Sequence, residues 1–143
     1  MITGIGTDVC SIERIDKSLK RYGERFVKRI LTAEERIRFE RTRDKAGHFA
    51  KRWAAKEAFA KALGTGIHPP FTWHSITVTR DRRGKPGIRP SAAMAAHLKG
   101  LGVTESHVSL SDDVGVAIAF VVLEGSPSPR AGIQRERAGG EGR

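Results

Sequence analysis

The sequence has little with which to build a disulfide, a membrane span or a secretory leader. It contains one cysteine, Cys10, which has no partner for an internal disulfide. No apolar run approaches the roughly 20 residues that span a bilayer. The first residues, MITGIGTDVCSIERI, lack a basic segment followed by a long apolar stretch, so we expect no secretory signal. These absences favour a cytoplasmic protein in a reducing environment, without a membrane partner.

Several familiar site motifs are also missing. The five histidines are scattered and show no metal-ligand spacing with Cys10. The sequence has no P-loop, no GxGxxG and no GxSxG motif. Aromatic residues make up only 6% and are not interleaved with basic residues, as they are on many surfaces that bind single-stranded nucleic acid.

Basic residues, in contrast, are abundant. The sequence has 26 Lys and Arg against 16 Asp and Glu, which gives a net charge of +10. Such a surface attracts anionic partners. Three kinds fit: nucleic acid, an anionic membrane, or an acidic protein together with a phosphorylated small molecule. Charge alone favours a basic nucleic-acid-binding module without catalysis, and this alternative stays open at this point.

Hydrophobic periodicity and turn signals predict an α+β domain over residues 1–124, with an antiparallel sheet and helices packed on it. The segment 125–143, rich in Gly, Pro, Ser and Arg, is expected to be a flexible tail. We predict helices over 11–22, 32–41, 48–63 and 91–100, and strands over 2–9, 76–79, around 88, over 106–110 and over 116–123, with a polar connection at 111–113.

The predicted helix 48–63 carries two residues that could bind a metal and a phosphate. Glu57 and Lys61 are four residues apart and therefore neighbours on one face. They could form an exposed ion pair, or they could be a metal-binding carboxylate and a phosphate-binding lysine. Arg52 and Lys56 are expected on the polar surface of the same helix. Gly64, Thr65 and Gly66 follow as either an ordinary helix stop or a phosphate-binding turn.

Asp8 is the second candidate carboxylate. An acidic residue at the end of a predicted strand is unusual and needs a reason. Asp8 could cap the following helix, or it could bind a metal. Mg²⁺ is usually held by one or two carboxylates together with substrate phosphates and water. An Asp and a Glu brought together by folding would satisfy it. Cys10 is expected to be a packing residue, and Trp53 and Trp73 are expected in the core or in a pocket wall.

Three blocks taken together identify a family. They are GIGTDVCSIERI (4–15), RWAAKEAFAKALGTGI (52–67) and HVSLSDDVGVAIAFVVLE (107–124). In this order and spacing they resemble the holo-acyl-carrier-protein synthase family of phosphopantetheinyl transferases. The resemblance implies transfer of 4'-phosphopantetheine from coenzyme A to a serine of an apo acyl carrier protein, with Mg²⁺ as cofactor. It also implies a homotrimer with active sites between subunits, and it argues against a nucleic-acid partner.

The resemblance assigns roles residue by residue. Asp8 and Glu57 match the magnesium ligands and, with Lys61, the catalytic group. Arg14 matches a basic residue that docks the carrier, and charge alone adds Arg21 and Arg25, with Lys20 and Lys28 beside them. The positions that match the coenzyme A pocket are Arg52, Lys61, Gly64, Thr65 and His107.

This chain departs from the family pattern at three positions. His48 stands where many members have an aromatic residue, Asp112 where many have a histidine, and Asp44 where a basic residue is common. These departures concern nucleotide binding and leave Asp8 and Glu57 untouched. The sequence does not distinguish a fatty-acid carrier from a polyketide carrier.

Overall fold

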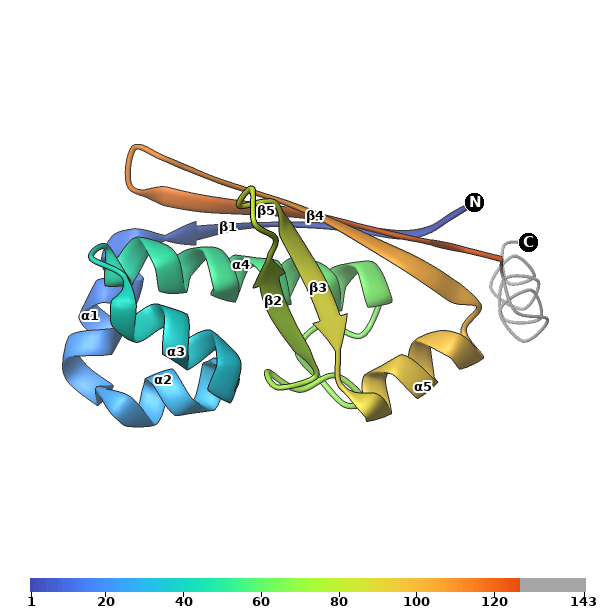
Figure 1. The fold of residues 1–143 in the computed structure, drawn as a ribbon, viewed down its shortest axis with the longest axis horizontal. Coiled ribbons are helices and arrows are strands. Elements are labelled where there is room, and N and C mark those ends of the chain that lie inside the picture. The colour runs from blue at the N-terminus through green and yellow to red at the C-terminus, as the bar shows by residue number, and fades with distance from the viewer. Residues whose placement is uncertain (127–143) are drawn as a thin grey trace, which may run out of the picture.

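The computed structural model describes residues 1–126 of the chain. They form five helices and five strands in the α+β arrangement expected from the sequence (Figure 1). In chain order these are β1 (Ile2–Ser11), α1 (Ile12–Tyr22), α2 (Glu24–Ile30), α3 (Ala33–Arg41), α4 (Lys45–Leu63), β2 (Ile76–Arg80), β3 (Pro86–Pro90), α5 (Ala92–Gly100), β4 (Val103–Asp113) and β5 (Val116–Gly125).

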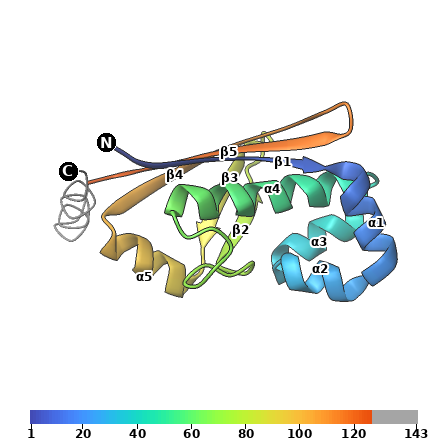
Figure 2. The same cartoon turned by 180° about the vertical axis from the view of Figure 1, so that it is seen from behind.

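Two antiparallel sheets are present rather than one. β1, β5 and β4 form a three-stranded sheet in that order, so the first strand of the chain pairs with the last. β2 and β3 form a separate two-stranded hairpin. The helices lie on one side of the three-stranded sheet, with α4 running beneath it, as both views of the molecule show (Figures 1 and 2).

The contact between β1 and α4 is unusually close because β1 presents glycine to the helix. A Cβ on Gly6 would overlap the carbonyl oxygen of Ala58, and a Cβ on Gly4 would overlap that of Ala62. Glycine therefore lets the strand lie directly on the helix backbone. Because side chains alternate along a strand, Asp8 shares the face of Gly4 and Gly6 and points toward α4. This close packing brings two distant parts of the sequence together.

Helix boundaries follow local capping chemistry. Ser11 caps α1, and Ser91 caps α5, each accepting a hydrogen bond from a backbone N–H three residues on. Thr32 and Glu35 form the predicted capping box of α3. Gly64 ends α4 in the left-handed region, at φ 87°. The predicted starts of α1, α3 and α5 and the predicted end of α4 are therefore confirmed.

A buried ion pair between Lys56 and Glu35 connects several elements to α4. Lys56 Nζ lies 2.7 Å from Glu35 Oε1 and donates to the carbonyl oxygens of Ile30 and Trp73, each at 2.7 Å. Burial lowers the pKa of Lys56, and the neighbouring Glu35 opposes that shift. Glu35 also accepts from the backbone N–H of Val78 at 2.9 Å. The pair thus ties the end of α2, the start of α3 and the hairpin strand β2 to α4.

The structure corrects the sequence predictions at several places. The expected surface positions of Arg52 and Lys56 are wrong, because their exposed fractions are 1% and 0%. Helix α2 was not predicted, although Phe26, Val27 and Ile30 have helical spacing after Gly23. α4 begins three residues early, at Lys45, because Asp44 caps it through the N–H of Gly47.

The strands also differ in length from the prediction. β1 continues to Ser11, so Asp8 lies inside the strand and does not cap α1. β4 includes residues 111–113, and only Val114 and Gly115 connect it to β5. The strand β5 ends at Gly125, one residue past the predicted domain boundary. Residues 127–143 lie outside the described part of the chain, so the predicted flexible tail stays a prediction. No helix within residues 1–126 is long and apolar enough to cross a membrane.

Candidate active site

Asp8 and Lys61, which are 53 residues apart, form an ion pair between β1 and α4. Lys61 Nζ lies 3.3 Å from Asp8 Oδ1 and donates to the carbonyl oxygen of Thr7 at 2.9 Å. The Asp8 side chain is 16% exposed and the Lys61 side chain 52% exposed. Lys61 therefore pairs with the aspartate from the solvent side, and the i,i+4 ion pair with Glu57, one of the two alternatives from the sequence, is not formed.

Glu57 lies one helical turn before Lys61 and within electrostatic reach of Asp8. Burial raises the pKa of Glu57, the Asp8 carboxylate raises it further, and Lys61 opposes both effects. Burial likewise raises the pKa of Asp8, against the effect of its hydrogen bond from Lys61. The site thus holds two partly buried carboxylates and one lysine. The predicted meeting of Asp8 and Glu57 is consistent with this geometry.

The pKa of a third group, the Cys10 thiol, is shifted by the same two carboxylates. Burial, followed by the charges of Asp8 and Glu57, raises the pKa of Cys10 to about 11. Cys10 is buried on the same face of β1 as Asp8. A thiol in this setting stays protonated and unreactive, which agrees with the packing role expected for it.

A cavity of about 270 Å³ opens beside Asp8. Its wall comes from the end of β1, from α1 and from the aromatic side chains of Phe26 and Trp53. Ser11, Arg14 and Ser18 supply polar groups. The cavity therefore joins the carboxylate site to the basic first helix, and Arg14 lies at the junction.

A larger basic groove lies between α1 and α2, and it shares Phe26 with this cavity. It has a volume of about 810 Å³ and is lined by Arg21, Tyr22, Arg25, Phe26 and Arg29. Lys20 and Lys28 are less available for a partner, because each pairs with an acidic residue one turn earlier, Asp16 and Glu24. Of the residues that charge alone suggested, Arg21 and Arg25 therefore line the groove, and Arg29 joins them.

The Gly64–Thr65–Gly66 segment serves as the helix stop. The backbone N–H groups of all three residues donate to the carbonyl oxygen of Ala60, at 3.1, 3.2 and 3.1 Å. Thr65 Oγ1 donates to the carbonyl oxygen of Gly66 at 2.8 Å. These amides are occupied by the end of α4, so they do not form an open phosphate-binding turn here. The coenzyme A roles of Gly64 and Thr65 stay predictions.

The side chain of Arg52, which belongs to α4, is buried away from the carboxylate site. Burial, followed by the charge of Arg80, lowers its pKa to about 10. It donates to the carbonyl oxygen of His48 at 3.4 Å. Its predicted contact with coenzyme A stays a prediction.

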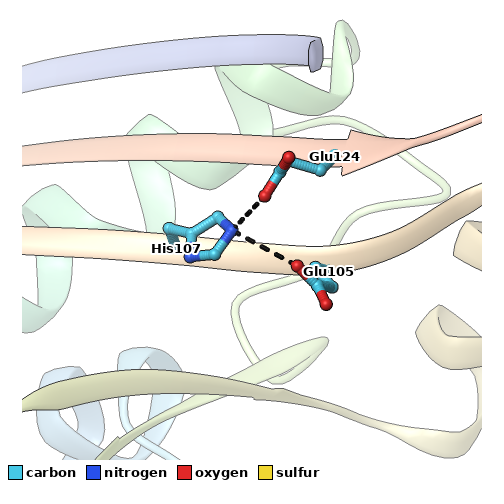
Figure 3. Close-up of side chains that lie close together, drawn as sticks. All are labelled: Glu105, His107 and Glu124. Carbon is cyan, nitrogen blue, oxygen red and sulfur yellow. Dashed lines mark hydrogen bonds and ion pairs between the residues drawn. The ribbon is translucent and has the colours of Figure 1, made fainter. Parts of the chain in front are cut away.

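His107 lies on the opposite face of the sheet from Asp8. It pairs in register with Val122, which in turn pairs with Ile5, and these residues face away from α4. His107 Nε2 lies 2.6 Å from Glu124 Oε1 and 3.7 Å from Glu105 Oε2 (Figure 3). Sequence reasoning missed these two glutamates. The register between β4 and β5, which places Glu124 beside His107, cannot be predicted from the amino-acid sequence alone.

Comparisons with known proteins identify the family of this chain. The family model for the 4'-phosphopantetheinyl transferase superfamily matches residues 4–119. A protein from Thiobacillus denitrificans named holo-[acyl-carrier-protein] synthase is 52% identical over 126 residues, covering 88% of this chain and 96% of its own.

Two solved structures extend the likeness to the fold. The holo-[acyl-carrier-protein] synthase of Neisseria meningitidis superposes with a TM-score of 0.83 at 42% identity, covering 87% of this chain and 99% of its own. The holo-[acyl-carrier-protein] synthase of Helicobacter pylori, solved in complex with coenzyme A, superposes with a TM-score of 0.76 at 32% identity. The match covers 84% of this chain and 99% of the Helicobacter pylori chain. The sequence predictions of family, α+β fold and enzyme class are confirmed. The chain belongs to the 4'-phosphopantetheinyl transferase superfamily.

Proposed function

We propose that this protein is a holo-[acyl-carrier-protein] synthase, which transfers 4'-phosphopantetheine from coenzyme A to a serine of an apo acyl carrier protein. The observation that carries the proposal is the convergence of Asp8 from β1 with Glu57 and Lys61 from α4, next to a cavity that reaches the basic first helix. The names of the relatives and the coenzyme A complex of the Helicobacter pylori protein support the same reaction.

The donor set at Asp8 and Glu57 fits Mg²⁺. Both ligands are hard carboxylate oxygens, and each of the two groups has a raised pKa, so a bound cation would relieve the cost of their charges. When bound, Mg²⁺ would neutralise negative charge on the pyrophosphate of coenzyme A. Asp8 and Glu57 would hold it, and Lys61 would be free to turn from Asp8 toward a phosphate.

The transfer exchanges one P–O bond for another. The carrier serine oxygen attacks the β-phosphorus of coenzyme A, and the bond to the bridging oxygen breaks. Adenosine 3',5'-bisphosphate leaves with that oxygen, and the serine proton passes to a base. Glu57 would take this proton, because its raised pKa makes it a stronger base than an ordinary glutamate. Lys61 neutralises charge that builds on the phosphates.

The uncovered face of the sheet supports assembly as a homotrimer. Ile5, Val9 and Phe120 are 61%, 62% and 46% exposed, and they point away from the helices. An apolar face of this kind is typical of a buried interface. His107 lies on this face and Asp8 on the other, so the two cannot line one pocket within a subunit. In a trimer, His107 of one subunit would contact coenzyme A at the carboxylate site of its neighbour.

The carrier would dock along the basic first helix. Arg14 borders the cavity beside Asp8, and Arg21 and Arg25 line the adjoining groove. Acidic carriers are steered to such a surface and oriented on it. Because Arg14 and Asp8 line the same cavity, a docked carrier would present its serine to the reacting phosphate. We therefore expect the protein to act in the cytoplasm with its carrier, without a nucleic-acid or membrane partner.

To test this function, the protein is incubated with an apo acyl carrier protein, coenzyme A and Mg²⁺. The mass of the carrier is then measured by mass spectrometry. The expected result is a carrier mass increased by one phosphopantetheine group, and no change when EDTA is present. An unmodified carrier, with salt-sensitive binding to DNA or RNA instead, would favour the nucleic-acid-binding alternative. Fatty-acid and polyketide carriers assayed side by side would identify the preferred partner.

A further inference from the structure

The buried ion pair between Lys56 and Glu35 has no part in the transfer chemistry, although Lys56 directly precedes Glu57 in α4. Both Lys56 and Glu57 follow Trp53 by about one helical turn, so all three lie near one another along the helix. The side chains of Lys56 and Glu35 are 0% and 1% exposed. Apolar side chains in place of such a pair often leave a fold equally stable, so stability alone does not account for these buried charges.

The ammonium group of Lys56 donates to three separate segments of the chain. Its acceptors are Glu35 Oε1 in α3, the carbonyl oxygen of Ile30 at the end of α2 and the carbonyl oxygen of Trp73 in the loop before β2, each at 2.7 Å. An ammonium group has three N–H donors, so each of them has a partner. The carbonyl of Ile30 is at a helix end, where no intrahelical N–H is available to it. Lys56 therefore joins the end of α2 and the loop at Trp73 to α4.

Glu35 holds the ammonium group in one place. Its Oε1 also accepts a hydrogen bond from the backbone N–H of Thr32 at 2.8 Å, and its Oε2 accepts one from the backbone N–H of Val78 at 2.9 Å. Hydrogen bonds to a carboxylate are stronger and more directional than those between neutral groups. Both oxygens of Glu35 are therefore fixed by the backbone, and Lys56 is fixed by Glu35.

Each of the two segments that Lys56 holds brings an aromatic ring to Trp53. The ring centroids of Trp73 and Trp53 are 4.4 Å apart, with an angle of 32° between the ring planes. Phe26, one turn before Ile30 in α2, has its ring centroid 5.9 Å from that of Trp53. Aromatic pairs at these separations attract one another and prefer particular orientations. The side chain of Trp53 is therefore held by two rings whose backbone segments are bonded to Lys56.

Trp53 and Phe26 form the aromatic part of the cavity wall beside Asp8. Arg14 lines the same cavity, and the serine of a docked carrier would enter there. A displaced Trp53 would change the shape of this cavity without changing Asp8 or Arg14. Small displacements of side chains around a reactive site are enough to alter how a substrate fits.

We propose that Lys56 and Glu35 are positioning residues, which hold Trp53 in the wall of the reaction cavity and act on carrier binding through it. Both side chains are buried, so they touch no substrate themselves. The link runs from Lys56 through the carbonyl oxygen of Trp73 to the ring of Trp73, and from that ring to Trp53. This inference rests on the proposed function, since the acyl carrier protein is the partner that enters the cavity.

A spectroscopic measurement on the full chain tests the position of Trp53. The variant K56M/E35M replaces both charges with apolar side chains, so no unpaired charge is left in the core. Trp53 and Trp73 are the two tryptophans of the chain, and rings this close couple their electronic transitions, which gives a paired band in circular dichroism. We expect K56M/E35M, folded by urea titration, to lose this band. The control E34Q/R89M removes an exposed ion pair between α3 and β3 and should keep it.

Steady-state kinetics of the same proteins test the effect on the carrier. We expect K56M/E35M to raise the KM for an apo acyl carrier protein by at least about fivefold, since one aromatic contact contributes about this much. The KM for coenzyme A should stay unchanged, as should both constants of E34Q/R89M. A loss of stability alone would lower the amount of active enzyme and leave both KM values as they are. A folded K56M/E35M with the wild-type band or the wild-type carrier KM would overturn the proposal.

A second variant decides the question if K56M/E35M does not fold. W73A removes the ring that supports Trp53 and leaves the buried ion pair in place. We expect the same rise in the carrier KM, and a wild-type carrier KM in W73A would rule out the link through Trp73. A wild-type protein that transferred nothing would contradict the proposed function alone. The circular dichroism comparison uses neither coenzyme A nor carrier, so it would still decide whether the pair positions Trp53.

Discussion

Lys61 Nζ lies 3.3 Å from Asp8 Oδ1, so the lysine of α4 is the counter-ion of a carboxylate on β1. The pair depends on the glycines of β1, which let the strand lie directly on the helix backbone. A divalent cation bound by Asp8 would compete with Lys61 for this carboxylate. Its side chain is half exposed, so it can exchange Asp8 for a substrate phosphate without unfolding the helix.

Replacing this lysine should weaken substrate binding. In K61M the methylene stem is kept and the charge is lost, so the phosphates of coenzyme A lose one charge-assisted contact. We expect the KM for coenzyme A to rise by about tenfold. Steady-state kinetics with a saturating carrier measure this, with K99M on α5 as the matched control. A K61M enzyme with the wild-type KM and kcat would remove Lys61 from the site.

Charge reversal on the first helix should act on the carrier. Arg14 is exposed beside the cavity at Asp8, and an acidic carrier would meet it directly. We expect R14E to raise the KM for the carrier by about tenfold or more, with a much smaller effect on the KM for coenzyme A. K99E makes the same charge change far from this helix and should leave both constants unchanged. Equal increases in the two KM values for R14E would argue against a docking role.

The close approach of β1 to α4 should be sensitive to a single methyl group. In G6A the new Cβ would meet the carbonyl oxygen of Ala58, which belongs to the helix backbone and cannot turn away. We expect the free energy of unfolding to fall by about 1–3 kcal/mol in urea titrations. G100A is the control, because a Cβ on Gly100 of α5 meets nothing within 4 Å and helix propensity improves. If G6A were as stable as G100A, the packing account would be wrong.

Acid stability should depend on His48. Its folded-state pKa of about 3 lies below the ordinary 6.5, so in this window the unfolded chain binds a proton that the folded chain does not. The free energy of unfolding therefore falls as the pH drops from 6.5 toward 3. H48Q removes this contribution and should flatten the acid side of the pH profile, while H68Q, at an exposed histidine, should keep it. Parallel profiles for the wild type and H48Q would contradict the buried neutral imidazole.

Local chemistry predicted much of the fold, and long-range packing accounts for most of what it missed. Helix caps could be predicted from the sequence because each acts within a few residues. Examples are the Thr32–Glu35 capping box, the Ser11 and Ser91 caps and the helix end at Gly64. Helix α2 was missed because it is short and follows another helix after a single glycine. The length of β4 was underestimated because its last residues, such as Ser111 and Asp113, are polar and exposed, and polarity there resembles a loop.

The same division holds for the site. Asp8, Glu57 and Lys61 came from a resemblance, and the structure supplies the physical reason why β1 and α4 bring them together. The burial of Lys56 could not be read from helical periodicity, because Glu35, its partner, lies 21 residues away.

The most direct test of the account is the rate of carrier modification by D8N and E57Q over a range of Mg²⁺ concentrations. Each change removes one negative charge and keeps the shape of the side chain, and E13Q on exposed α1 removes the same charge elsewhere. The account predicts a loss of at least about a hundredfold for D8N and E57Q, with folding intact by circular dichroism and with E13Q unchanged. Wild-type rates for either D8N or E57Q at ordinary Mg²⁺ would contradict it.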